Sequence, residues 1–86
     1  MIQSDLVPAD FASVTLCPLT TDVEPARMFR VGLAPAPATG LRVASAIMVD
    51  KVQTLPRARL RSRIGALDVA TMRTVDEALR VWLGLA

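Results

Sequence analysis

The chain has 86 residues, enough for one small domain, and 52% of them are hydrophobic, which excludes a disordered chain. Ten basic residues oppose eight acidic ones, and the arginine-dominated excess points towards a nucleic-acid or acidic partner, although arginine-rich coding explains it as well. With no histidine and one cysteine, the sequence excludes an internal disulfide, the usual structural zinc sites and a histidine-based catalytic triad.

The first predicted strand covers residues 12–19, after a turn or loop over residues 1–11. Val14 and Leu16 alternate with polar neighbours along it, which is the period of a half-buried strand. Pro18 cannot donate a hydrogen bond to a neighbouring strand, so we expect the strand to bulge, to lie at a sheet edge or to end at this residue.

A second strand is predicted for residues 28–33, with Phe29, Val31 and Leu33 on the face that points to the core. The run A-P-A-P-A-T-G at residues 34–40 holds two prolines and a glycine and is therefore predicted to be a connector.

The middle of the chain predicts further extended segments. Residues 41–43 indicate a short strand, residues 45–49 a strand buried on both faces, and residues 52–55 an extended continuation up to Pro56. Together with the earlier strands they predict a small antiparallel sheet.

Residues 57–64 alternate arginine with mostly apolar residues, which favours a strand or extended turn over a helix for part of the segment. In a strand the arginines would lie about 6.6–7 Å apart along one side, a loose match to the spacing of phosphates. A solvated sheet edge that resists pairing with other sheets explains the same stripe equally well. The stripe consists of Arg57, Arg59, Arg61 and Arg63.

The C-terminal segment predicts one amphipathic helix over residues 68–83, with Asp68 as its N-cap and Gly84 as the residue that ends it. Because the helix cannot bury its apolar stripe alone, we expect it to cover the sheet or a partner. The stripe comprises Met72, Val75, Ala78, Leu79, Trp82 and Leu83.

This order of elements predicts an α+β fold, a small antiparallel curled sheet or half-open barrel closed by the C-terminal helix, in a single domain over residues 1–86. A chain of this size has a small core, so we expect it to oligomerise. No apolar run approaches the length of about 18 residues that spans a bilayer, and no secretory signal is evident, so we expect no membrane partner and a cytoplasmic location.

Two polar clusters follow predicted strands. The hydroxyls of Thr20 and Thr21 could hold a phosphate, although the pattern alone favours an ordinary polar turn. Asp50 and Lys51 follow the buried strand, where the carboxylate could accept a proton, and a strand end with a local ion pair explains them as well. No metal site or cofactor is predicted.

The order of these features resembles the MazF/PemK (Kid-like) family of bacterial toxins along essentially the whole chain. The matching pieces are I-Q-S-D at residues 2–5, V-T-L-C-P-L-T-T at 14–21, F-R-V at 29–31, G-L at 40–41, A-I-M-V-D-K-V-Q-T-L at 46–55, R-I-G-A-L at 63–67, and the last helix with V-D-E-A-L-R at 75–80 and L-G-L at 83–85. Each piece is short, and their common register carries the resemblance.

The resemblance implies an SH3-like curled sheet of the CcdB/MazF type, a homodimer, a cognate antitoxin, and an endoribonuclease that cuts single-stranded RNA without metal, through the RNA's own 2′-hydroxyl. The family's catalytic threonine falls on Thr20, and the acidic candidate of the Kid-like branch falls on Asp50. The arginine that this branch carries two residues earlier is Met48 here. The residues expected to contact RNA are Thr21, Arg27, Arg30, Lys51 and Arg57.

The sequence departs from the family's pattern at its front. Family members carry a first strand, a loop with a catalytic arginine and an Arg-Pro-led second strand before the I-Q-S-D turn, whereas this chain starts at Met1, where that second strand should be ending. We therefore expect a barrel that is incomplete at the N-terminus and little or no ribonuclease activity from the 86-residue chain. A start placed too late, a natural remnant and a partner that completes the sheet each explain the departure.

Three other functions are left open. A non-catalytic remnant would bind and titrate the antitoxin without cutting RNA. A CcdB-like gyrase inhibitor shares the fold and needs a tryptophan near the end of the helix, the place of Trp82, although the P-L-T-T and V-D-K pieces fit the ribonucleases better. An unrelated arginine-rich RNA-binding domain is the last alternative.

Overall fold

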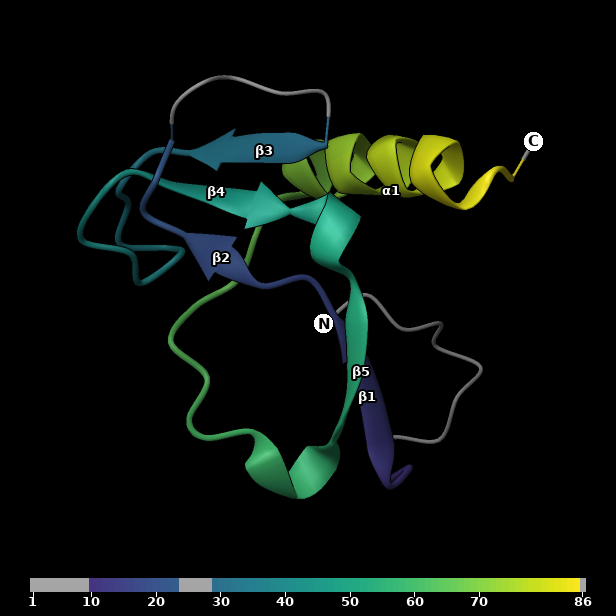
Figure 1. Ribbon diagram of the computed structural model, residues 1–86. Coiled ribbons are helices and arrows are strands. Elements are labelled where there is room, and N and C mark those ends of the chain that lie inside the picture. Colours follow the sequence, from purple (N-terminus) through teal and green to yellow (C-terminus); the bar gives the residue numbers. More distant parts are fainter. Residues whose placement is uncertain (1–9, 24–28, 86) are drawn as a thin grey trace.

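The computed structural model describes residues 10–23 and 29–85, and Figure 1 shows two small sheets and one long C-terminal helix. Arg27, one of the residues predicted to contact RNA, lies outside the described residues. The predicted α+β order of antiparallel strands followed by one helix is confirmed. The elements in chain order are β1 (Ser13–Leu16), β2 (Leu19–Thr20), β3 (Arg30–Leu33), β4 (Ser45–Met48), the 3-10 turn η1 (Val49–Lys51), β5 (Gln53–Pro56), the 3-10 turn η2 (Arg57–Arg59) and α1 (Val69–Leu83).

The strands form a three-stranded sheet in the order β2-β4-β3 and a two-stranded sheet of β1 and β5, all antiparallel. Cys17 and Pro18 separate β1 from β2, and η1 separates β4 from β5, so both pairs of strands pass from one sheet to the other at the same place. There the amide of Met48 donates to the carbonyl of Pro18 at 2.8 Å. The described strands therefore curl without closing into a barrel, and the predicted interruption at Pro18 is confirmed.

The helix α1 covers one face of the three-stranded sheet. Val31 and Ile47 lie directly opposite each other on β3 and β4, and with Val49 they pack against Val75 and Ala78 of α1. Because alternate residues of a strand point to opposite faces, this packing commits one face of the sheet to the core and leaves the other face for different contacts.

The C-terminal end of α1 is less buried than the predicted stripe implies. The ring of Trp82 packs edge-on against Phe29, with 5.1 Å between the ring centroids, yet 46% of Trp82 stays exposed. Leu83, predicted to widen the stripe, is 54% exposed and lies outside the core. Figure 1 shows the reason, since the last turns of α1 extend past the strands that they would need to cover.

Both ends of α1 are capped as predicted. The amide of Thr71 donates to Oδ1 of Asp68 at 2.7 Å, and hydrogen bonds from the side chain and the amide of Thr71 lower the pKa of Asp68. Gly84 adopts the left-handed conformation, with φ of 70°, and its amide bonds back to the carbonyl of Val81. The two caps fix where the helix begins and ends.

Replacing Asp68 with alanine should destabilise the fold at neutral pH and have little effect in acid. The folded state holds this carboxylate at a lowered pKa, so the unfolded chain binds more protons in this range and stability rises with pH. The contribution is therefore present above the ordinary value of 3.8 and is lost as the pH falls through the lowered pKa. Thermal unfolding of Asp68→Ala, with Asp76→Ala in the middle of the same helix as control, measures it. A loss of stability that is the same at neutral and acid pH would contradict this assignment.

Two extended segments predicted from the sequence are absent from the described residues. Residues 41–43 contribute one isolated bridge and no strand. Residues 57–64 leave the sheet, because β1 begins at Ser13, opposite Pro56, and offers no further partner to a longer β5. The chain instead makes η2 and an irregular loop, so the four arginines do not line one side of a strand.

Two glycines hold the loop after η2 against the connector between β3 and β4. Gly40, with φ of 72°, faces the backbone of Ile64, and Gly65 faces the backbone of Thr39. A Cβ atom at either glycine would collide with that backbone. This close approach fixes where residues 57–67 return to the sheet.

Candidate functional site

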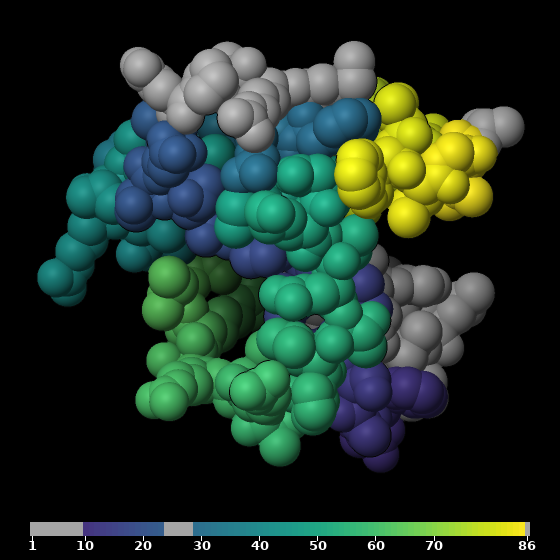
Figure 2. Space-filling view, in the orientation of Figure 1, coloured from purple at the N-terminus to yellow at the C-terminus, as the bar shows by residue number. Residues whose placement is uncertain are grey.

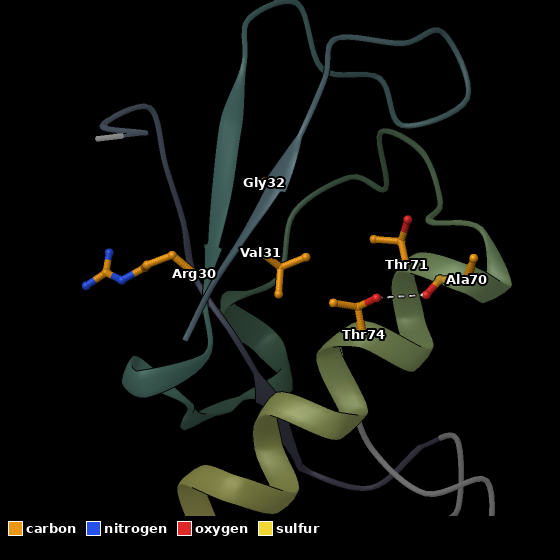
Figure 3. Close-up of a pocket in the computed structure, with 6 residues that line it drawn as sticks. All are labelled: Arg30, Val31, Gly32, Ala70, Thr71 and Thr74. Atoms are coloured by element: carbon orange, nitrogen blue, oxygen red, sulfur yellow. Dashed lines mark hydrogen bonds between the residues drawn. The ribbon is translucent and has the colours of Figure 1, made fainter. Parts of the chain in front are cut away.

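The face of the three-stranded sheet that points away from α1 carries several predicted site residues. In the strand register Thr20 lies opposite Ala46, and Arg30 lies opposite Met48. Residues directly opposite each other, and residues two apart along a strand, share a face. Figure 3 shows the side chains of Arg30 and Val31 on opposite sides of β3, with Val31 towards α1. Thr20, Arg30 and Met48 therefore share the face that the helix leaves uncovered.

Arg30 and Asp50 form an ion pair at one end of this face. The turn η1 follows β4 directly and places Asp50 within reach of β3. Nη2 of Arg30 donates to Oδ2 of Asp50 at 3.2 Å, and Nε lies 3.0 Å from Oδ1 without the alignment of a hydrogen bond. The side chains are 18% and 24% exposed, so solvent screens this pair less than it screens a surface salt bridge. Arg30 thereby fixes the carboxylate of Asp50.

The sequence predicts roles for both residues but not their contact. The alternation of residues 28–33 already places Arg30 on the face opposite the core. Only the pairing of β3 with β4 reveals that its cross-strand neighbour is Met48, two residues before Asp50. The arginine that the resemblance expects at position 48 is thus matched here by an arginine on the adjacent strand.

The hydroxyl of Thr20 is oriented by the turn that follows β2. Its Oγ1 accepts a hydrogen bond from the amide of Asp22 at 3.1 Å, which is a common Ser/Thr turn. This contact uses an oxygen lone pair and leaves the hydroxyl proton available to donate. Thr20 is half-buried, and Thr21 is exposed beyond the end of the strand. An ordinary turn and a phosphate contact are therefore compatible at this position.

Thr20 and Asp50 are not brought into contact. Ala46, opposite Thr20, comes four residues before Asp50, and at about 3.3 Å per extended residue the two side chains lie on the order of 10 Å apart. A single phosphate group cannot touch both. A polymer with successive phosphates can contact both at once.

The other predicted cations differ in how free they are. Lys51 is exposed at the end of η1, next to Asp50. Arg57 is half-buried, and its Nε donates to the carbonyl of Phe11 at 2.7 Å. Part of the Arg57 guanidinium therefore braces the segment before β1, and its remaining N–H groups are the ones that could bind a ligand.

A shallow hollow of about 410 Å³ lies between β3 and the first turns of α1, a feature that no sequence motif indicates. The hydroxyl of Thr74 at its edge donates to the carbonyl of Ala70 at 3.2 Å, as Figure 3 shows. Its lining is otherwise short apolar or hydroxyl side chains apart from Arg30. The hollow thus lacks the converging polar groups of a built small-molecule site. Its lining residues are Arg30, Val31, Gly32, Ala70, Thr71 and Thr74.

Within residues 10–23 and 29–85 there is no group of three or more His, Cys, Asp or Glu side chains that could hold a metal ion. In the same part of the chain, α1 and the short helical turns are too short or too polar to span a membrane.

The comparisons with known sequences give a consistent result. Residues 1–83 match the family described as PemK-like, MazF-like toxin of type II toxin-antitoxin system. A Mycolicibacterium smegmatis protein named "Probable endoribonuclease MazF" is 45% identical over 86 residues, which is 100% of this chain and 78% of that protein.

The comparisons with solved structures agree. The Mycobacterium tuberculosis toxin MazF-mt6 superposes with a TM-score of 0.83 at 26% identity, over 96% of this chain and 81% of that one. A structure titled "Crystal structure of Mtb toxin" gives 0.72 at 28% identity, over 83% and 75%. The MazE-MazF structure from Deinococcus radiodurans gives 0.73 at 22% identity, over 88% and 73%, and shows likeness of fold.

Proposed function

The chain belongs to the PemK-like, MazF-like toxins of type II toxin-antitoxin systems, and from this premise we propose that it acts on single-stranded RNA as an endoribonuclease, using the 2′-hydroxyl of the RNA as nucleophile and no metal ion. The observation that carries the proposal is the 45% identity, over the full 86 residues, to a protein named as an endoribonuclease. A substrate-derived nucleophile also suits a sequence that contains no histidine.

The proposed reaction uses the uncovered face of the sheet. The 2′-oxygen bonds to the adjacent phosphorus, the bond to the 5′-oxygen breaks, and a 2′,3′-cyclic phosphate forms. Asp50, kept ionised by Arg30 at 3.0 Å, takes the proton of the 2′-hydroxyl. The N–H groups of Arg30 that do not face Asp50 stabilise the charge that develops on the phosphate oxygens. Thr20 donates its hydroxyl proton to a neighbouring phosphate, since it lies too far from Asp50 to share one.

The partners follow from the family. A type II toxin is neutralised by a protein antitoxin, which we propose as a partner of this chain. We also propose a homodimer, located in the cytoplasm where its RNA substrate is made. Val81, Trp82 and Leu83 at the end of α1 are 60%, 46% and 54% exposed, and they supply an apolar surface for such protein contacts.

Inhibition of gyrase is the second candidate function. The observation in its favour is the partial exposure of Trp82 near the end of α1. The same ring packs on Phe29, which gives it a structural role as well. A supercoiling assay with purified gyrase separates this function from cleavage of RNA.

The proposal is tested with purified chain in excess over a labelled single-stranded RNA, in EDTA. We expect slow cleavage that leaves a 2′,3′-cyclic phosphate and a 5′-hydroxyl, and no cleavage of the all-2′-deoxy oligonucleotide. Excess protein is used because we predict a low rate for the 86-residue chain by itself. Rapid multiple turnover would refute the predicted low rate, and cleavage of the deoxy oligonucleotide, or dependence on a metal, would refute the mechanism. A chain that binds the antitoxin and cuts no RNA would instead be the non-catalytic alternative.

A further inference from the structure

The segment between η1 and α1 concentrates positive charge. Residues 51–67 contain five basic side chains and no acidic one, although the whole chain has a net charge of only +2. Three of the five fall between η2 and the loop that follows it, at Arg59, Arg61 and Arg63. The segment is therefore a local cationic surface on a nearly neutral protein.

This cationic segment is anchored at both ends. At its start the amide of Arg57 donates to the carbonyl of Ala12 at 2.7 Å. At its end the amide of Ala66 donates to the carbonyl of Ala38 at 2.9 Å, beside the interlocked glycines. All side chains from residue 58 to residue 64 are exposed between these anchors. Figure 2 shows this segment, in green, standing on the surface of the molecule.

The arginines of this segment are free to bind a ligand. Arg59 and Arg61 make no hydrogen bond or ion pair with any described residue, and Arg63 spends only its Nε on the carbonyl of Gly65, at 3.3 Å. Leu60 and Ile64, between and beside them, are 42% and 65% exposed. An exposed row of guanidinium groups with interleaved apolar side chains fits a sugar–phosphate backbone with its bases better than it fits water alone.

The segment also returns to the sheet at the end where Thr20 lies. It docks on the connector that leaves β3 after Leu33, and Leu33 pairs with Ser45, the neighbour of the residue opposite Thr20. Asp50 lies beyond the opposite end of β4. A single strand that passes from Asp50 to Thr20 is thus directed towards the cationic segment.

We propose that residues 57–63, here called the basic arm, bind the sugar–phosphate backbone of single-stranded RNA beyond the site of cleavage. The inference rests on the proposed function for the identity of the substrate. It adds a binding surface that holds flanking nucleotides and that makes RNA affinity depend on salt. Each phosphate neutralised by an arginine releases condensed counterions, which gives a defined salt dependence.

The test compares two double variants with the same loss of charge. Arg59→Gln with Arg61→Gln removes the two unpartnered cations of the basic arm, and Arg73→Gln with Arg80→Gln removes two exposed cations of α1. The probe is a fluorescent single-stranded RNA of about 12 nucleotides with 2′-O-methyl riboses, which the chain cannot cut by the proposed route. Anisotropy titrations over a series of salt concentrations give the slope of log K against log[salt], and thermal unfolding confirms that each variant is folded.

The basic-arm variant should lose about 1.4 from that slope, roughly 0.7 for each phosphate contact, and bind about 25-fold more weakly at about 0.1 M salt. The helix variant should keep the slope of the wild type. An unchanged slope in the basic-arm variant, equal losses in both variants, or no binding of RNA by the wild type would each overturn the inference. Equal loss of binding to a polyglutamate peptide would overturn it too, by identifying a site for acidic proteins.

The readout separates this inference from the proposed function. Affinity for the uncleavable RNA does not depend on cleavage. Salt-dependent binding through the basic arm by a chain that cuts no RNA would sustain the inference and refute the activity. Cleavage by the wild type at a rate that the basic-arm variant shares, with the same salt dependence, would do the reverse.

Discussion

Arg30→Met should lower the single-turnover rate of RNA cleavage by about 100-fold or more, the loss typical of one donor that stabilises developing charge. The variant removes the guanidinium that lies 3.0 Å from Asp50 and leaves a half-buried carboxylate without its cation. We expect the free energy of unfolding to fall by only about 1–2 kcal/mol, because both groups are still partly in water. Rates with excess protein, together with thermal unfolding, measure both effects.

The matched control restores the cation from the neighbouring strand. Arg30 and Met48 are directly opposite each other and share a face, so Met48→Arg in the Arg30→Met background can place a guanidinium beside Asp50. We expect it to recover part of the lost rate, whereas Arg73→Met on α1 should leave the rate unchanged. An Arg30→Met variant with the activity of the wild type would remove this ion pair from the site.

Gly65→Ala should destabilise the fold by about 3 kcal/mol or more, which lowers the melting temperature by more than about 10 °C in a domain of this size. A Cβ at position 65 meets the backbone of Thr39, and backbone cannot move aside as a flexible side chain can. Gly40→Ala should behave similarly, because its φ of 72° also disfavours a side chain. Thermal unfolding by circular dichroism measures the loss.

Gly32→Ala is the control for these substitutions. A Cβ at position 32 meets nothing within 4 Å, and its backbone is not in the left-handed region. We expect it to be neutral or to stabilise by up to about 1 kcal/mol, since alanine restricts the unfolded chain more than glycine does. Equal melting of Gly65→Ala and Gly32→Ala would show that the loop does not approach the connector as closely as the structure describes.

The helix could be predicted from the sequence because its signals are local. Asp68 and Gly84 mark its two ends within the segment itself, and the spacing of Val75 and Ala78 selects the buried face. The strand around Val31 could be predicted for the same reason, because alternation is a property of a few adjacent residues.

The extended segment after Pro56 could not be predicted, because a strand also needs a partner. The alternation of residues 57–64 is that of a strand, and the sheet stops because β1 offers no residue beyond Ser13 to pair with. Partnering is a property of the whole fold and leaves no mark in the local pattern.

The candidate site was predictable in its residues and not in its geometry. Thr20 and Asp50 follow strands and could be singled out one by one, but their separation follows from a register of β2 and β4 that the sequence does not state. The contact of Arg30 with Asp50 depends on the order of strands in the sheet, since these residues are 20 positions apart in the chain. Their roles in cleavage stay predictions.

The central claim is that RNA lies across the sheet face that α1 leaves uncovered, and an NMR titration of the isotope-labelled chain with an uncleavable single-stranded RNA tests it most directly. The account predicts the largest chemical-shift changes at the amides of Thr20, Thr21, Arg30 and Lys51, with Trp82 little affected. Changes that gather around Trp82 on α1 and spare Thr20 and Arg30 would contradict it.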